Sequence, residues 1–323
     1  MRADSPSIGE SITFSTTTSP LELKWQNTVF TPPELAERTT GLGSLFIIPV
    51  GAEQQIRIKR PNVIGQVQLG LAGSTYAIGL ALPETDNAIL RVEDDKVVAR
   101  HTASLRAFGN TLAVSADGTT LVAFDQQQNM FVLNAMSLDP QTTQQIDSGV
   151  LSVAIAPDGS RIAYITSDAN LHFCNTSDLK TIVTQKAPVL WDGQIGFSST
   201  GKWLTHMGVR PVDGASETEH QLTIYDGESG KQVASTVIDW KSNNPPRLLF
   251  SEDDTTLYIS TDNIRAVSVP ELDSVSKWKI GAEIRSMAAN EDEHILFCGT
   301  ASGNILVVDT RFGHLSKRLH RSL

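Results

Sequence analysis

Short apolar runs separated by polar turns recur along this chain, most regularly from Val150 to Gln185. That segment holds four runs of about five to seven residues rich in Val, Ile, Tyr and Phe, which suit a pleated, half-buried surface. Turns separate the runs at Pro157-Asp158-Gly159, at 167–170 and at 175–178. The pattern predicts a four-stranded antiparallel meander. Because one meander cannot bury its apolar faces alone, it also predicts a unit that repeats.

The turn at Gly159 has counterparts along the chain, each followed after two or three residues by an apolar residue that starts the next run. The residues at the matching place are Gly73, Gly118, Gly201, Asp254 and Asp292. A period of about 40 to 45 residues with four strands per period is the pattern of a β-propeller. Glycine tolerates the positive φ of a tight hairpin, so we expect a longer or different hairpin where aspartate stands.

We therefore predict an all-β fold, a single β-propeller domain over residues 11–323 after a polar lead-in at 1–10. Most simply it has seven blades of four antiparallel strands, near residues 11–60, 61–103, 104–147, 148–186, 187–239, 240–281 and 282–323. Six blades with an N-terminal appendage are the alternative. Either residues 12–15 or residues 315–319 supply the outer strand of the last blade. The one helical candidate follows Pro32-Pro33, at Glu34–Glu37.

Two stretches, Asp168–Ile182 and Ser302–Leu315, resemble the end of a WD repeat, in which alternating hydrophobic residues lead to Trp-Asp and, four residues on, a glycine. The resemblance covers roughly residues 60–320 and implies the WD-repeat propeller fold. The chain departs from the family pattern because no Gly-His opens the repeats. The Trp-Asp pair is replaced by Cys174-Asn175, Tyr225-Asp226 and Val308-Asp309, so the hydrogen-bond network that stiffens WD blades is largely absent. Residues 157–164 equally resemble repeats of TolB-like and lactonase-type propellers.

Composition narrows the possible partners and the compartment. Of 323 residues, 40% are hydrophobic and 19% are charged, which is typical of a globular protein. A net charge of -10 argues against binding to nucleic acid or to an anionic membrane. We see no stretch of about 18 apolar residues and no secretory leader. Cys174 and Cys298 are predicted to be free thiols in strands. We expect a soluble, cytoplasmic protein, or the propeller portion of a longer polypeptide.

No linear catalytic motif is present, and the seven histidines lack the spacing of a metal site. The repeat places His172 in a third strand, and His206 and His294 in second strands. A lactonase-type propeller would imply a His or Glu set at the mouth of the central channel, whereas the inner strands offer Arg247 and Arg285. We predict no catalytic residue, no metal ligand and no cofactor. A small-molecule hydrolase or lactonase with its site in the channel is the alternative function.

The sequence favours a loop surface for binding. In a propeller, the loops that join second to third strands and the loops that join one blade to the next open on the same face. That face would carry the insertion at 209–220 and the blade connections at 186–193 and 239–247. The candidate partner-binding residues are Trp191, Arg210, Asp213, Glu217, Trp240, Lys241 and Arg247. Trp and Arg beside rigid loops are typical of protein-binding hot spots, although both tryptophans could instead plug the junctions between blades.

The sequence thus predicts a non-catalytic scaffold for protein–protein interaction. Its partners would be proteins, and the chain itself would be a monomeric ring or a subunit of a larger complex.

Overall fold

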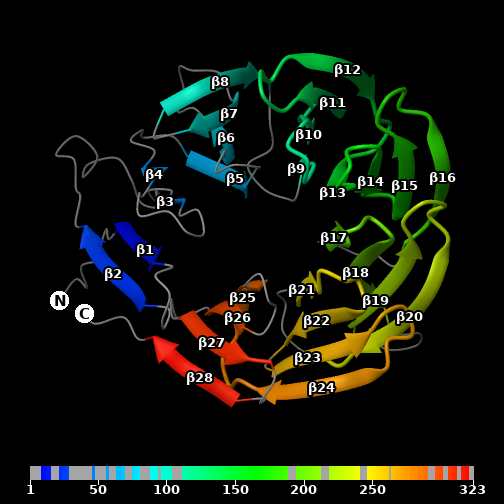
Figure 1. Cartoon of the computed structure of the whole chain (residues 1–323). Coiled ribbons are helices and arrows are strands. Elements are labelled where there is room, and N and C mark those ends of the chain that lie inside the picture. The colour runs from blue at the N-terminus through cyan, green and yellow to red at the C-terminus, as the bar shows by residue number, and fades with distance from the viewer. Residues whose placement is uncertain are drawn as a thin grey trace, which may run out of the picture. The chain divides into compact units, whose positions relative to one another are not determined.

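The computed structural model describes a set of segments that cover most of the chain from residue 88 onward. These segments are 9–15, 22–28, 46–47, 56–57, 63–69, 75–80, 88–93, 96–103, 111–187, 194–211, 218–240, 246–261, 263–289, 295–300, 305–310 and 314–319. The chain divides into two compact units, the first formed by Met1–Val114 and Gly118–Gln145 and the second by Ser115–Asp117 and Ile146–Leu323. The regular structure described is entirely β, from β1 to β28 (Figure 1).

The described part of the first unit contains two two-stranded ladders and two four-stranded sheets, all antiparallel. β1 pairs with β2 and β3 with β4, while β5 to β8 and β9 to β12 each form a meander. The strands are β1 Gly9–Ser15, β2 Glu22–Thr28, β3 Phe46–Ile47, β4 Ile56–Arg57, β5 Val63–Leu69, β6 Thr75–Leu80, β7 Ala88–Glu93, β8 Lys96–Thr102, β9 Leu112–Val114, β10 Thr120–Phe124, β11 Asn129–Asn134 and β12 Pro140–Gln145.

The described part of the second unit contains four sheets of the same kind, in which four consecutive strands pair in sequence order. The strands are β13 Val150–Ile155, β14 Arg161–Thr166, β15 Asn170–Asn175, β16 Thr181–Lys186, β17 Gln194–Phe197, β18 Trp203–Pro211, β19 Thr218–Asp226, β20 Gln232–Ile238, β21 Arg247–Phe250, β22 Thr256–Ser260, β23 Asn263–Ser268, β24 Ser274–Lys279, β25 Ile284–Ala289, β26 Ile295–Thr300, β27 Ile305–Asp309 and β28 His314–Leu319.

These sheets fall within the segments that the repeat period assigns to single blades. Residues 315–319, not residues 12–15, supply the outer strand of the last sheet, because β28 is its fourth strand and β1 pairs with β2. The first strand begins at Gly9, inside the expected lead-in. In the stretch 11–60 the described strands form two separate ladders, so a complete seventh blade stays a prediction. The helical candidate at 34–37 lies outside the described residues.

The first turn recurs with the same geometry in the meanders where the structure describes it. In Gly159 and Gly201 φ is 70° and 77°, and each backbone N–H donates to the carbonyl three residues earlier, at 2.9 Å. Our expectation for Asp254 was wrong: its φ is 59°, and its N–H donates to the Ser251 carbonyl at 3.1 Å. Asp254 thus forms the same tight turn as the glycines. Asp292 lies outside the described residues.

A tertiary contact explains why aspartate serves at position 254. Its side chain is 4% exposed, and its Oδ2 accepts hydrogen bonds from the hydroxyls of Ser198, at 2.7 Å, and of Thr200. Both donors belong to the equivalent turn of the neighbouring β17–β20 sheet. Aspartate tolerates the left-handed conformation better than most residues do. The charge-assisted hydrogen bonds then connect the turns of two adjacent sheets.

The turn between the third and fourth strands explains the Trp-Asp-like pairs. The second residue of the Tyr225-Asp226 pair accepts hydrogen bonds within the turn, since Asp226 Oδ1 accepts from the Ser229 N–H at 2.7 Å. Four residues after it the backbone has positive φ, at Leu179 (54°) and at Gly230 (68°). A Cβ on Gly230 would lie 2.6 Å from Val183 Cγ1 and 2.7 Å from Phe173 Cδ2. Packing therefore requires glycine at position 230, whereas the equivalent position 179 holds leucine with a similar φ.

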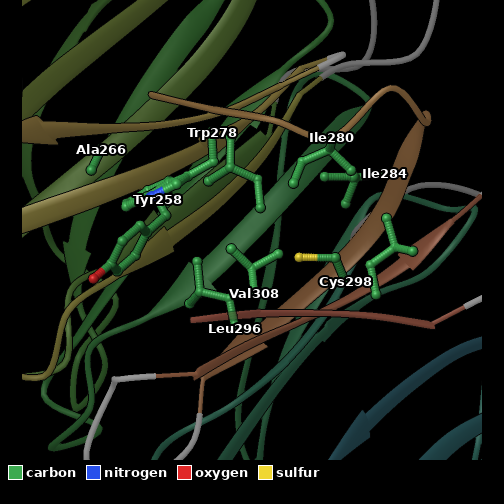
Figure 2. Packing of buried hydrophobic residues seen from close by; sticks show 10 residues of the cluster. Tyr258, Ala266, Trp278, Ile280, Ile284, Leu296, Cys298 and Val308 are labelled. Carbon is green, nitrogen blue, oxygen red and sulfur yellow. The ribbon is translucent and has the colours of Figure 1, made fainter. Parts of the chain in front are cut away.

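Apolar residues fill the space between consecutive sheets. In the first unit one cluster joins the β5–β8 and β9–β12 sheets around Ile89, Leu121 and Leu133. In the second unit three clusters join the four sheets in turn. Figure 2 shows the last of these, where Trp278 and Tyr258 of the β21–β24 sheet face Leu296, Cys298 and Val308 of the next sheet. Such burial of large apolar side chains is the main source of stability for stacked sheets.

Candidate functional site

The hairpin of β18 and β19 is the longest in the described part of the chain. Nine residue pairs join its strands, from Trp203↔Asp226 to Pro211↔Thr218. The equivalent hairpin of the preceding sheet, β14 with β15, has five pairs. The extra pairs continue the ladder into the segment that the sequence identified as an insertion. The start and end of this insertion are therefore ordered β-structure.

An ion pair joins the two strands near the tip of this hairpin. Arg210 and Glu219 face each other in the ladder, and the Arg210 guanidinium contacts the Glu219 carboxylate. The Arg210 side chain remains 45% exposed and that of Glu219 23%. A cross-strand pair of opposite charges stabilises such an extension by a few tenths of a kcal/mol to about 1 kcal/mol. Arg210 still presents part of its guanidinium to solvent.

The base of the extension is tied to the next blade connection. His220 is 6% exposed, and its Nδ1 lies 3.2 Å from the backbone oxygen of Trp240. Burial lowers the pKa of His220, and this backbone hydrogen bond raises it by a smaller amount. His220 is thus favoured in the neutral form with Nδ1 as donor. The contact fixes the start of the 239–247 connection against the hairpin.

Trp240 is half-buried and packs against the cluster between the β17–β20 and β21–β24 sheets, beside Ile238 and Leu257. Trp240 therefore fills the junction between two blades, which is the alternative that the sequence left open for both tryptophans. Trp191, Asp213, Glu217 and Lys241 lie outside the described residues. Arg210 contacts Glu219, and Trp240 contacts the next residue, His220, whose side chain points to the opposite face of β19. The predicted binding set as a whole stays a prediction.

Arg247, the first residue of β21, is half-buried and contacts the neighbouring inner strand. With the Gln194 amide oriented so that its Nε2 donates to the Pro246 carbonyl at 3.2 Å, its Oε1 accepts from Arg247 Nη1. Arg247 therefore connects the starts of β17 and β21 rather than extending freely into solvent. Sequence reasoning selected Arg247 but not Gln194, because the pair is 53 residues apart and no local pattern joins them.

Other chemistry can be located but is sparse in the described part of the chain. Cys174 and Cys298 are free thiols buried in β15 and β26, as predicted, and burial raises the pKa of each to about 12. His172 and His206 lie in the third and second strands of their sheets, also as predicted, while His294 lies outside the described residues. Among the described residues no three His, Cys, Asp or Glu side chains are grouped so that they could hold a metal ion. The described segments also contain no helix that could span a membrane.

Repeated four-stranded meanders with recurring turn geometry define the class of fold as an all-β propeller of the WD-repeat type. Solved structures agree with this class. The chain is similar to the WD40 domain of coronin from Toxoplasma gondii, with a TM-score of 0.59 and 14% identity over 78% of this chain and 70% of that one. It is also similar to hydrazine synthase from Kuenenia stuttgartiensis, with a TM-score of 0.57 and 14% identity over 78% of each chain.

At 14% identity these likenesses show the fold alone. No family model and no curated protein sequence matches the chain. The predicted fold class and the resemblance to WD-repeat propellers are thus confirmed, and the number of blades stays a prediction.

Proposed function

We propose that this protein is a non-catalytic platform for a protein partner, and that the partner docks on the loop surface made by residues 186–193, 209–220 and 239–247. The observation that carries this proposal is the β18–β19 hairpin. It is four residue pairs longer than the β14–β15 hairpin, nine against five, and an ion pair stiffens it near its tip. An ordered hairpin loses little conformational entropy when a partner binds.

The chemistry of the surface supports a protein partner. The half-exposed Arg210 guanidinium offers planar donors to backbone carbonyls or carboxylates, and Arg is enriched in binding hot spots. Trp191 and Lys241 belong to the two connections that flank the hairpin, and they add an aromatic ring and a second positive charge. The net charge of the chain is -10, so a polyanionic partner is disfavoured.

We place this activity in the cytoplasm, because both cysteines are free and free thiols are usual in reducing compartments.

Affinity capture with matched variants tests the proposal. The test variant combines Trp191→Ala, Arg210→Ala and Lys241→Ala. Trp240 is left in place because its ring packs on the apolar cluster and its loss would disturb the fold. The control variant carries three changes at exposed positions of the β9–β12 sheet, Met136→Ala, Gln141→Ala and Gln145→Ala.

A partner retained by the wild type and the control but lost by the test variant, with unchanged melting of all three, is the expected result. Equal capture by all three proteins would move the binding site elsewhere. Failure of the wild type to retain any protein would reject the platform.

A further inference from the structure

The outermost strand β20 lacks the charges and the proline that often protect the edge of a sheet. Edge strands usually avoid pairing with other chains by carrying charges or proline, by a β-bulge, or by being short. The β19–β20 ladder has a register shift between Ile224 and Tyr225, and the ladders of the other outer strands have one at the matching place, so this feature does not distinguish β20. β20 is seven residues long, Gln232–Ile238, and contains no charged residue and no proline. Its exposed face presents Val233 and Val237, each 47% exposed, on either side of Ser235. The edge is therefore long, apolar and without a charge that would repel another strand.

The other outer strands differ at the position that matches Ser235 in the ladder register. That position is Arg100 in β8, Lys277 in β24 and Arg318 in β28. It is neutral in β12 and β16, at Thr143 and Thr184. In those two strands other features interfere with self-pairing. β12 begins with Pro140 and has aspartates four residues on each side of Thr143. β16 has Ile182 two residues before Thr184 and Lys186 two residues after it. β20 is thus the exception among the outer strands of the described sheets.

The sequence around Ser235 is complementary to itself in the antiparallel direction. If two copies of β20 pair with Ser235 opposite Ser235, Val233 of each copy lies opposite Val237 of the other, and Ala234 lies opposite Thr236. At both ends of the pair Lys231 then lies opposite Asp239. Both residues are exposed, and neither takes part in an ion pair with another described residue. Opposite charges facing each other across an antiparallel pair stabilise it, and like charges destabilise it.

We propose that this chain forms a twofold homodimer by antiparallel pairing of β20 with β20 of a second copy, centred on Ser235. The backbone edge supplies hydrogen bonds, the two Val233–Val237 pairs bury exposed apolar surface, and the two Lys231–Asp239 pairs set the register. An isologous contact of this kind closes on itself and stops at two copies. It resembles the way an added strand extends a sheet edge in peptide recognition. The dimer does not depend on the proposed loop surface.

Sedimentation equilibrium measures the consequence. One strand pair makes a small interface, so association is expected over about 1 to 200 µM rather than at nanomolar concentration. The weight-average mass should rise with concentration from the chain mass of 35.0 kDa toward about 70 kDa, twice that value. Ser235→Lys places two like charges at the axis and should hold the mass at that of one chain. The matched change Thr184→Lys, on the equivalent position of β16, should leave the association unchanged.

A charge exchange tests the register independently of folding. Lys231→Asp alone and Asp239→Lys alone each create two like-charged pairs in the homodimer, so each variant should associate at least about tenfold more weakly than the wild type. An equimolar mixture restores two opposite-charged pairs. At one end the new carboxylate of the first variant faces the new ammonium group of the second, and at the other end the unchanged Asp239 of the first faces the unchanged Lys231 of the second. The mixture should therefore regain the dimer mass, which two unfolded variants could not do.

Three results would overturn the proposal. These are a wild type that stays at the mass of one chain throughout, a Ser235→Lys variant that dimerises as the wild type does, and a mixture that behaves as the separate charge variants. In the first case, binding of an extended segment of another protein to β20 would be the better reading of this edge.

Discussion

Replacing His206 should remove a specific part of the acid sensitivity of this protein. His206 lies in the middle of β18, opposite Ile195 of β17 and Thr223 of β19. It is 0% exposed, and neither ring nitrogen has a hydrogen-bond partner among the described residues. Ile195 and Leu204, its neighbours on the same face, belong to the apolar cluster against the β13–β16 sheet. Burial without a partner lowers the pKa of His206 to about 4, from an ordinary value of 6.5.

The sign and the size of the effect follow from proton linkage. Above pH 6.5 the imidazole is neutral in both states, so its titration contributes nothing to stability. Between pH 6.5 and about 4 the unfolded chain binds a proton that the folded chain does not, so the free energy of unfolding falls as the pH falls. A depression of about 2.5 pKa units at about 1.4 kcal/mol each corresponds to about 3.5 kcal/mol in all, of which about 3 kcal/mol is lost by pH 4.

Urea unfolding of the wild type and His206→Leu at several pH values measures this loss. At neutral pH the variant should be more stable by about 1 to 2 kcal/mol, because two buried and unpaired nitrogens are removed. Below pH 6.5 its advantage should grow by about 1.4 kcal/mol per pH unit. Other groups titrate equally in both proteins and cancel in the difference. His172→Gln is the control, since His172 is half-buried and lies 3.1 Å from the Thr184 hydroxyl.

A difference between wild type and His206→Leu that stays constant from neutral pH to pH 4.5 would refute this reasoning. It would mean that the imidazole titrates normally in the folded protein and so has access to water or to a partner. A control slope as steep as that of His206→Leu would likewise show that the effect is not specific to the buried position.

Three further predictions concern the turns and the thiols. Gly230→Ala should lower the free energy of unfolding, measured with a chemical denaturant, by about 2 to 4 kcal/mol. Gly281→Ala is the control, because Gly281 has the same φ of 68° but no atom within 4 Å of the added Cβ, and it should lower the free energy of unfolding by about 1 kcal/mol. Equal losses would contradict the packing argument. Asp254→Ala should lower stability by about 2 to 3 kcal/mol. Asp254→Asn should lower it by clearly less, because asparagine still accepts hydrogen bonds and tolerates positive φ. If thermal melting gave the reverse order, the hydrogen bonds from Ser198 and Thr200 to Asp254 would not have the role argued here. Cys174 and Cys298, with pKa values of about 12, should not react with a chromogenic disulfide reagent at pH 8 until the protein is unfolded, and rapid labelling of the native protein would show that they are accessible.

Local signals made most of the fold predictable. A hairpin turn needs a residue that accepts positive φ, and the strand after it needs apolar residues on one face, so Gly118, Gly159 and Gly201 locate their hairpins from a few neighbouring residues. The insertion at 209–220 was visible for the same reason, as a long interval between two such turns. The outer strand of the last sheet could not be predicted from local sequence, because residues 12–15 and 315–319 are equally strand-like.

The contacts that sequence reasoning missed are formed between sheets. The Asp254 carboxylate meets Ser198 at a separation of 56 residues, and the Arg247 guanidinium meets Gln194. Each of these residues looks like an ordinary turn or strand residue by itself. The requirement for glycine at 230 likewise depends on Phe173 and Val183 of the preceding sheet. A period locates the blades, but it does not show which side chains meet across their faces.

The loss of the Trp-Asp pair shows what the repeat needs physically. Where a WD repeat has its tryptophan, this chain has residues that share only their low exposure: Leu133, Cys174, Tyr225, Val267 and Val308. The next position needs a short side chain that can accept hydrogen bonds from the turn, as Asn134 Oδ1 does from two backbone N–H groups. These requirements admit many residue pairs at the two positions.

If the blade needs only these few residues, features of a sheet that the fold does not need are the ones that can indicate function. Two of them occur in the same sheet, the nine-pair hairpin of β18 and β19 and the uncharged edge of β20. Arg210 and Val237, one residue from each feature, are both exposed, so these side chains do not pack between sheets. An exposed apolar or uncharged edge carries a risk of unwanted association, and other outer strands carry charges against it. The two proposals give each feature a role, since the hairpin would contact a partner and the edge would contact a second copy.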